Sequence, residues 1–312
     1  MNINRFAYFA CALSLALLAC VFVWPSPAQE RPQVAITVDD LPSHGDLPSP
    51  MKRSDVAKSM IATFKAKGVP AVYGFVNAKN IAGDEDKADV LKIWVNAGFP
   101  LGNHTFSHID INTATPEAFE AEIAGNEPTL QALMGSKDWH WLRYPFLHEG
   151  DTLEKRHAVR TYLHEHGYKV AQVTLDFGDY AWNVPYARCA EKHDTPAMEW
   201  LKSSYLATAA DSFALDRKLS AMLFGRDIKY VLLMHIGGFD SVMLPELLDL
   251  MKKEGFDFVT LPDAEKDPAY ESDPDASLTH GGTLLEQLIE SKHMKYPPVP
   301  ERPMQKLDAI CR

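Results

Sequence analysis

The sequence predicts an α/β fold built around a parallel sheet. Short apolar runs alternate with amphipathic stretches between residues 34 and 261, and this alternation is typical of repeated strand–helix units. Polar residues follow several of the apolar runs, at the positions where parallel strands bring their carboxyl ends to one edge. The pattern fits an open sheet and a sheet closed into a barrel equally well.

The first strand is predicted at residues 34–38 and the second at residues 71–76, because both runs are short, apolar and rich in β-branched residues. Gly68 ends the intervening helix, residues 53–67, and a second helix covers residues 88–96. Thr115 and Pro116 begin a third helix as its N-cap and first residue. Pro128 is expected to kink or split that helix.

The alternation continues through the second half of the chain. The predicted strands are residues 139–143, 169–175, 229–234 and 256–261, and the predicted helices are residues 153–166, 196–224 (in one or two pieces) and 244–253. Residues 263–312 are rich in Asp, Pro and Ser apart from one amphipathic stretch at 284–289. We interpret them as a C-terminal extension packed on a domain of residues 29–262.

Composition limits the class of protein. The chain has 312 residues, of which 46% are hydrophobic and 23% charged, so it is globular rather than disordered. Its formal net charge is −11 and it has no long basic run, which argues against nucleic-acid binding. The oligomeric state does not follow from the sequence.

Residues 1–28 have the features of a secretory signal: a positive charge at Arg5, an apolar run over residues 6–24, and small residues up to Ala28. Cleavage after Ala28 predicts export to the periplasm or the cell exterior, with no stable membrane span. An uncleaved anchor and a lipoprotein box ending at Cys20 remain as alternatives. All three place the rest of the chain outside the cytoplasm.

Two cysteines, Cys189 and Cys311, remain after the signal. An even number in an oxidising compartment predicts a disulfide between them. The alternative is a pair of unrelated buried thiols.

Five residues are candidates for metal binding or acid–base chemistry. Asp39 and Asp40 directly follow the first predicted strand, and His235 follows the strand at 229–234. His104 and His108 are four residues apart, a spacing that directs both imidazoles to one side of a helical turn. One carboxylate and two imidazoles leave a coordination position open for water, which is the arrangement of a catalytic site.

Five ordered segments resemble the motifs of the polysaccharide deacetylases, the NodB homology domain of carbohydrate esterase family 4. They are Thr37-Val38-Asp39-Asp40-Leu41-Pro42, His104-Thr105-Phe106-Ser107-His108, Arg143-Tyr144-Pro145-Phe146, Asp176-Phe177-Gly178-Asp179-Tyr180 and Leu232-Leu233-Met234-His235. The resemblance covers about residues 34–261. It implies a distorted (β/α) barrel with about seven parallel strands, and it makes residues 183–227 a long helical insertion.

The resemblance also implies roles. Asp40, His104 and His108 bind one divalent metal, zinc first, with cobalt or nickel as alternatives. Asp39 is the general base that takes a proton from the attacking water, and Arg143 orients it. His235 is the general acid, held in position by Asp176. The backbone N–H of Phe146 stabilises the oxyanion beside Tyr144, and Leu233 lines the acetyl pocket.

These expectations describe an exported metal-dependent hydrolase acting on carbon–nitrogen bonds other than peptide bonds. Its substrate is the N-acetyl group, or an O-acetyl group, of a glycan such as peptidoglycan or a chitin-like oligomer. One alternative is a small non-glycan amide or imide, because the insertion can close the groove. Another is a non-catalytic carbohydrate-binding relative, because Leu41, Tyr180 and other motif edges depart from the family pattern.

Overall fold

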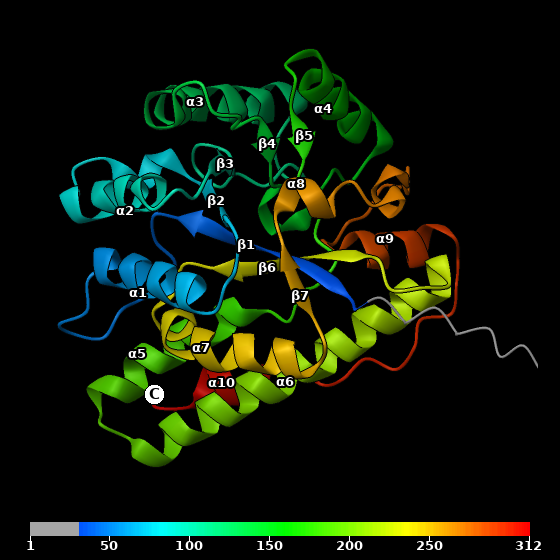
Figure 1. Cartoon of the computed structure of the whole chain (residues 1–312). Coiled ribbons are helices and arrows are strands. Elements are labelled where there is room, and N and C mark those ends of the chain that lie inside the picture. Colours follow the sequence, from blue (N-terminus) through cyan, green and yellow to red (C-terminus); the bar gives the residue numbers. More distant parts are fainter. Residues whose placement is uncertain (1–30) are drawn as a thin grey trace, which may run out of the picture. The chain divides into compact units, whose positions relative to one another are not determined.

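Seven parallel strands form one curled sheet in this computed structural model, which describes residues 31–312. The strand order is β5-β4-β3-β2-β1-β6, and β7 pairs with β1 beside this path (Figure 1). The strands are β1 (Gln33–Leu41), β2 (Tyr73–Val76), β3 (Leu101–Asn103), β4 (Trp141–Leu142), β5 (Lys169–Val170), β6 (Lys229–His235) and β7 (Asp257–Val259). The predicted parallel α/β fold is therefore confirmed.

Helices cover the sheet and connect its strands. They are α1 (Arg53–Ala66), α2 (Glu85–Asn96), α3 (Pro116–Met134), α4 (Leu153–Glu165), α5 (Asn183–Glu191), α6 (Thr195–Phe224), α7 (Gly238–Lys253), α8 (Leu261–Ala264), α9 (Leu284–Ser291) and α10 (Met304–Ala309). Short 3-10 turns occupy η1 (Ala78–Ile81), η2 (Pro145–Leu147), η3 (Asp179–Trp182) and η4 (Pro268–Glu271). None of the helices within residues 31–312 has both the length and the apolar character needed to cross a membrane.

Two expectations about helices change. The prediction was that Pro128 kinks or splits its helix; the helix is not split, because α3 runs unbroken across Pro128. Pro128 lies on the exposed side of α3, where water can hydrogen-bond the carbonyl that proline leaves without a donor. The stretch predicted at 196–224 is a single helix, α6, which begins at the N-cap Asp194 and ends at Gly225 in the left-handed region.

The sheet differs from the prediction at one strand in particular. The strand predicted over residues 169–175 is limited to β5, and only Leu175 continues it, as an isolated bridge to Leu232. Between β5 and Leu175, the backbone hydrogen-bonds with the C-terminal extension: the N–H of Leu284 donates to the carbonyl of Val173 at 2.7 Å. The sequence analysis missed β3, which leads directly into His104.

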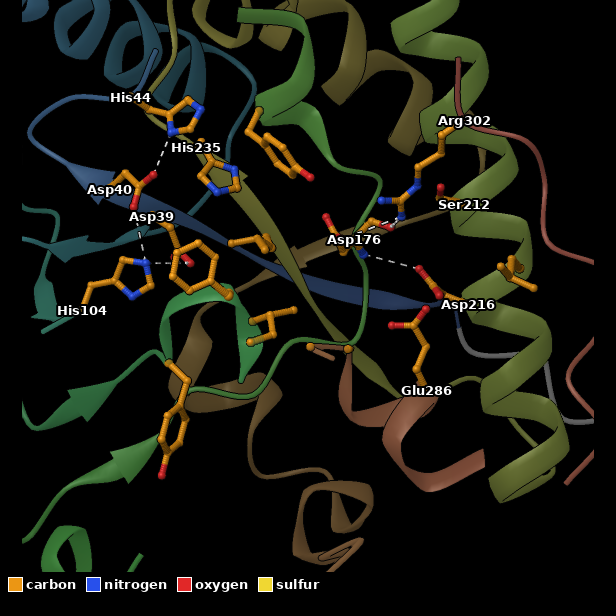
Figure 2. A pocket seen from close by; sticks show the side chains of 18 of the residues that line it. Asp39, Asp40, His44, His104, Asp176, Ser212, Asp216, His235, Glu286 and Arg302 are labelled. Atoms are coloured by element: carbon orange, nitrogen blue, oxygen red, sulfur yellow. Dashed lines mark hydrogen bonds and ion pairs between the residues drawn. The ribbon is translucent and has the colours of Figure 1, made fainter. Parts of the chain in front are cut away.

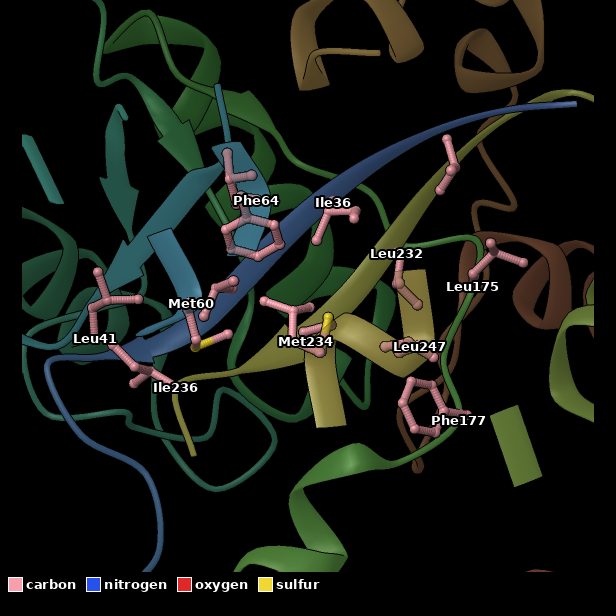
Figure 3. Close-up of a cluster of buried hydrophobic side chains, with 14 of the residues drawn as sticks. Ile36, Leu41, Met60, Phe64, Leu175, Phe177, Leu232, Met234, Ile236 and Leu247 are labelled. Atoms are coloured by element: carbon pink, nitrogen blue, oxygen red, sulfur yellow. The ribbon is translucent and has the colours of Figure 1, made fainter. Parts of the chain in front are cut away.

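The core lies between β1, β6 and the helices around them. Figure 3 shows its centre, where apolar side chains of the two strands meet those of α1 and α7: Ile36, Leu41, Met60, Phe64, Leu232, Met234 and Leu247. These side chains are all buried. Such close packing fixes the two strands against each other, and their carboxyl ends carry the residues of the candidate site.

The C-terminal extension is attached to the α5–α6 region. Cys189 on α5 and Cys311 form a disulfide, with their Cα atoms 5.2 Å apart, as the sequence predicts. The Arg188 side chain donates a hydrogen bond to the carbonyl of Leu307 at 2.9 Å, and α9 packs against α6. The predicted signal, residues 1–28, lies outside the described residues.

Candidate active site

A cavity of about 700 Å³ opens at the carboxyl edge of the sheet. Figure 2 shows two groups of polar side chains around it, one near Asp40 and the other near Asp216. The lining residues come from strand ends, from α6 and from the extension: Asp39, Asp40, His44, His104, His108, Tyr144, Phe146, Leu147, Asp176, Tyr180, Ser212, Leu215, Asp216, Leu233, His235, Gly281, Gly282, Glu286, Val299, Pro300 and Arg302. The prediction that motif residues from several strands meet at one edge therefore agrees with the fold.

Asp40, His104 and His108 offer ligand atoms close enough to share one metal ion. The Oδ1 atom of Asp40 lies 3.4 Å from Nε2 of each histidine. This oxygen is buried and makes no hydrogen bond with any residue of the 31–312 region. A buried carboxylate oxygen facing two imidazole nitrogens without a hydrogen bond fits a divalent ion of the zinc type.

The protonation of Asp40 and His108 also suits a metal. Burial, together with the charge of His104, lowers the pKa of His108 to about 4, which leaves a neutral imidazole. Burial by itself raises the pKa of Asp40, but the neighbouring His104 and His44 outweigh it and hold that pKa well below its usual range. Metal ligands must be deprotonated in this way.

Two of the three candidate ligands are oriented by a second contact. Nδ1 of His104 lies 2.7 Å from the carbonyl oxygen of Arg143, which turns Nε2 toward Asp40. Oδ2 of Asp40 lies 2.7 Å from Nδ1 of His44. The sequence analysis missed His44, although its position four residues after Asp40 was available as a signal.

Asp39 is held by Arg143, as the family resemblance implies. Nη1 of Arg143 donates to both carboxylate oxygens of Asp39, at 3.1 and 3.2 Å. The guanidinium also donates to the carbonyl of Ala171 and to the hydroxyl of Thr37. Both charged side chains are nearly fully buried. The pair is therefore a rigid, desolvated carboxylate next to the candidate metal site.

The partner of His235 is Asp179, and the prediction that Asp176 holds His235 is wrong. Nδ1 of His235 lies 2.7 Å from Oδ1 of Asp179, and the backbone N–H of His235 donates to the other oxygen. Gly178 adopts a left-handed conformation with φ 70°, and its N–H binds Asp176. The resulting turn places Asp179, which follows Asp176 by three residues in the same motif, beside His235.

The Asp179 contact changes the protonation of His235. Burial by itself lowers the pKa of His235, but the charge and hydrogen bond of Asp179 outweigh it and raise the pKa to about 10. His235 therefore carries a proton at neutral pH. Because Nδ1 is bound to Asp179, the other ring nitrogen is left to donate that proton.

Several site residues have left-handed backbones, which are unusual outside glycine. The φ angles are 64° at Asp40, 61° at His108 and 58° at Phe146. Such conformations cost about 1–3 kcal/mol each and cluster at functional sites, where the surrounding structure maintains them. Their presence at three predicted site residues supports a functional role for this edge.

The remaining predicted residues divide into buried and exposed groups. Leu233 and Tyr144 are 6% and 2% exposed, and the Tyr144 ring stacks on Phe119. The Phe146 side chain is 56% exposed, and its ring contacts that of His108 with centroids 4.5 Å apart. All three predicted residues line the cavity.

Comparison with known proteins shows a family likeness in the first part of the chain. Residues 26–171 match the family model described as polysaccharide deacetylase. The matched stretch contains the first three of the five motifs. Asp179 and His235 lie beyond it, as does every cavity residue of α6 and the extension.

Two curated fungal proteins, both from Arthroderma benhamiae, are similar in sequence. A chitin deacetylase is 26% identical over 152 residues, covering 49% of this chain and 36% of that protein. A probable peptidoglycan-N-acetylglucosamine deacetylase is 23% identical over 238 residues, covering 75% of this chain and 44% of that protein. The chain therefore spans less than half the length of either relative.

The fold has counterparts among solved structures. A polysaccharide deacetylase from Bacillus cereus superposes with a TM-score of 0.52 at 18% identity, covering 74% of this chain and 92% of the other. At this identity the likeness supports the fold alone, which is the (β/α) barrel type expected from the resemblance.

Proposed function

We propose that this protein is a metal-dependent deacetylase that hydrolyses the acetyl group of an amino sugar in a glycan of the chitin or peptidoglycan type. The proposal rests on one observation: three groups of side chains surround the same cavity. These are a candidate metal-ligand set, a buried Asp–Arg pair and an Asp–His pair. Amide hydrolysis needs an activated water, a stabilised oxyanion and an acid for the leaving nitrogen, and the three elements match these needs.

Asp40, His104 and His108 hold the metal in this proposal. When bound, the ion supplies a Lewis acid that polarises the acetyl carbonyl and increases the acidity of water. The orphaned Oδ1 of Asp40 and its two imidazole neighbours support this assignment. Zinc is the first choice because it favours two imidazoles and one carboxylate with an open position; cobalt and nickel accept the same ligands.

Asp39 is the proposed general base. Its carboxylate is buried and its orientation is set by Arg143, so it can accept the proton of the attacking water without rotating away. Oδ2 of Asp39 lies 3.7 Å from Nε2 of His104, which puts the base beside the metal ligands. Arg143 stabilises the charge of Asp39 until the proton arrives.

His235 is the proposed general acid. It is protonated at neutral pH because of Asp179. It lines the same cavity as the candidate metal ligands, and a ring nitrogen of His235 lies within 4.8 Å of a carboxylate oxygen of Asp40. Its free ring nitrogen donates a proton to the departing amine, and Asp179 then holds the neutral ring in place. The backbone N–H of Phe146 is the proposed oxyanion donor, and Leu233 faces the acetyl methyl group.

A small amide or imide is the second candidate substrate. It is favoured by the extension, whose residues Val299, Pro300 and Arg302 form part of the cavity wall and restrict how far a polymer can continue on that side. Export from the cytoplasm belongs to the proposal as well, and the Cys189–Cys311 disulfide supports it.

The test combines metal content with acetate release. Protein from Gln29 onward is purified, its metal is quantified, and acetate is assayed with peptidoglycan, chitin oligomers, acetylated xylan and small N-acetyl amides, with and without chelator. We expect stoichiometric metal and chelator-sensitive release of acetate from amino sugars. Metal binding without acetate from any glycan would reject the glycan substrate, and a chain that binds no metal would reject the ligand set.

A further inference from the structure

The cavity has a second polar end that the proposed reaction does not use. Figure 2 shows Asp176, Ser212, Asp216, Glu286 and Arg302 together, away from Asp40 and His104. We call these five residues the acidic subsite. They come from the turn after β5, from α6 and from the extension, all beyond the stretch that matches the family model.

Asp216 is a buried carboxyl group that no cation of residues 31–312 contacts directly. It is 4% exposed, and its one hydrogen bond is a long one, 3.4 Å from the backbone N–H of Asp176. Among residues 31–312 it forms no ion pair. Burial, with the charges of Glu286 and Asp176, raises its pKa well above the usual range, so the empty subsite favours the neutral acid and a cation bound beside it would favour the carboxylate.

Ser212 adds a hydroxyl at the same end of the cavity. Its side chain lies one helical turn before Asp216 on α6, is 7% exposed and lines the cavity. Within the part of the chain that the structure describes, its hydroxyl makes no hydrogen bond. Both side chains are more than nine-tenths buried and both line the cavity, so they indicate a polar ligand in this part of the cavity.

The charge of the subsite specifies the kind of ligand. Three carboxylates face one guanidinium, and Arg302 is already engaged with Asp176, donating to its carbonyl at 3.0 Å and lying 3.7 Å from its carboxylate. Asp216 and Glu286 point toward one another in Figure 2, and both lack a cation within the described chain. An anion would be repelled here, whereas an ammonium group would find two carboxylates and a hydroxyl to accept its three N–H donors.

A metal ion fits this end less well than an organic cation. The subsite residues are absent from the sets of ligand atoms, among residues 31–312, that lie close enough to share an ion. An ammonium group on a larger molecule does not need that convergence, because each of its hydrogens can reach a different acceptor.

We infer that the acidic subsite binds an ammonium group of the substrate, namely the free amine of a sugar unit that has already lost its acetyl group, while the acetamide of another unit occupies the metal end. The inference rests on the proposed function. Both ends belong to one cavity, so one short oligosaccharide can contact both. The protein then favours partly deacetylated oligomers over fully acetylated ones.

The walls of the subsite are held in place by the fold. Glu286 accepts hydrogen bonds from the backbone N–H of Thr283 at 2.7 Å and from the hydroxyl of Tyr296 at 3.0 Å. Gly178 leaves room for Arg302, since an added Cβ would lie 2.8 Å from its guanidinium. The disulfide at Cys311 fixes the chain beyond Arg302. The subsite is therefore preorganised rather than formed by a loose tail.

Direct binding tests the inference independently of turnover. Calorimetry compares the glucosamine dimer, which has free amines, with the di-N-acetylated dimer, using the wild-type chain and Asp216→Asn. We expect the wild type to bind the amine dimer and Asp216→Asn to bind it about tenfold or more weakly, with little change for the acetylated dimer. Asp211→Asn is the matched control, because Asp211 is an exposed residue of α6, and it should bind like the wild type.

Folding of the variants is checked by circular dichroism and thermal melting. If Asp216→Asn does not fold, Glu286→Gln is the second test, since the glutamine oxygen can still accept from the N–H of Thr283 while the charge is removed. Equal affinity of wild type and folded variant for the amine dimer would overturn the inference.

Turnover separates this inference from the proposed function. Acetate release is compared for the half-acetylated and the fully acetylated dimer. A higher kcat/KM for the half-acetylated dimer, lost in Asp216→Asn, supports the inference. Equal values for the two dimers contradict the inference and leave the deacetylase proposal intact. No acetate from either dimer contradicts the proposed function, and the calorimetry still decides whether the subsite binds amines.

Discussion

Asp39 and His235 are register partners on the neighbouring parallel strands β1 and β6. They are 196 positions apart in sequence, yet the ladder brings the proposed base and the proposed acid to the same level of one edge. Each is held by its own charged partner, Asp39 by Arg143 and His235 by Asp179. The sheet therefore places the two proton-transfer groups on adjacent strands. The carboxylate of one lies beside a guanidinium and the imidazole of the other lies beside a carboxylate.

Replacing the proposed base should abolish turnover and leave the metal in place. Asp39→Asn keeps the size of the side chain but removes the proton acceptor, so we expect kcat to fall by a factor of about 10²–10⁴. Bound metal is measured on the same sample and should remain stoichiometric, because Asp39 is outside the candidate ligand set. A variant with normal rates would contradict the role of Asp39.

Loss of a proposed ligand should remove both metal and activity. His104→Ala deletes one of two imidazoles and leaves the orphaned Oδ1 of Asp40 with a single neighbour. We expect metal content to drop to background and acetate release with it, whereas the chelated wild type should recover on adding zinc. Retention of one metal per chain by His104→Ala would show that the ligand set is wrong.

Removing His44 should weaken metal binding without eliminating it. His44 contacts the Asp40 oxygen that faces away from His104 and His108, and outer partners of this kind typically contribute about 10–100-fold in metal affinity. We expect that loss for His44→Ala in a competition titration with a chromophoric chelator. His157→Ala is the matched control, because His157 is an exposed histidine. Equal affinities for the two variants would leave His44 without a role at the metal.

The Asp179–His235 pair should make stability depend on pH with a definite sign. The pKa of His235 is raised to about 10 in the folded chain, against about 6.5 for a histidine in an unfolded one. The contribution of the Asp179–His235 pair to the free energy of unfolding is therefore complete below about pH 6.5, and it is lost as the pH rises toward about 10. Asp179→Asn should destabilise the chain strongly near neutral pH and much less at the alkaline end, measured by urea unfolding with chelator present.

The same variant should change the pH dependence of catalysis. Without Asp179, the pKa of His235 falls, so the alkaline limb of the kcat/KM profile should move to lower pH. The measurement is a pH–rate profile of the wild type and Asp179→Asn. An alkaline limb that stays in place would mean that His235 is not the general acid.

Breaking the disulfide should loosen the extension. Cys311→Ser releases a link between residues 122 positions apart in sequence, and removal of a native disulfide of this kind costs about 2–5 kcal/mol. We expect a lower Tm and faster proteolysis between α9 and the C-terminus. Reduced wild type is the control and should behave like Cys311→Ser. An unchanged Tm in both samples would show that the extension is held by its other contacts.

The sequence by itself determined the fold class and most of the metal end of the site. Strand–helix alternation is a local property of the chain, and a residue that ends a strand in such a pattern lies at the carboxyl edge. This reasoning located Asp39, Asp40 and His235, and the four-residue spacing of His104 and His108 predicted that both imidazoles face one side of a turn. Arg143 came from the resemblance of its motif to the family. The cysteine pair could be predicted because only two cysteines remain after the signal.

The tertiary structure decided the contacts that depend on where the chain turns and on which distant segments meet. The partner of His235 is Asp179 rather than Asp176, because Gly178 adopts a left-handed turn that no periodicity specifies. The acidic subsite joins Asp216 on α6 to Glu286 on α9 and Arg302 in the extension. Long-range packing of this kind depends on the complementary shapes and charges of whole elements, and no local pattern in the sequence carries that information.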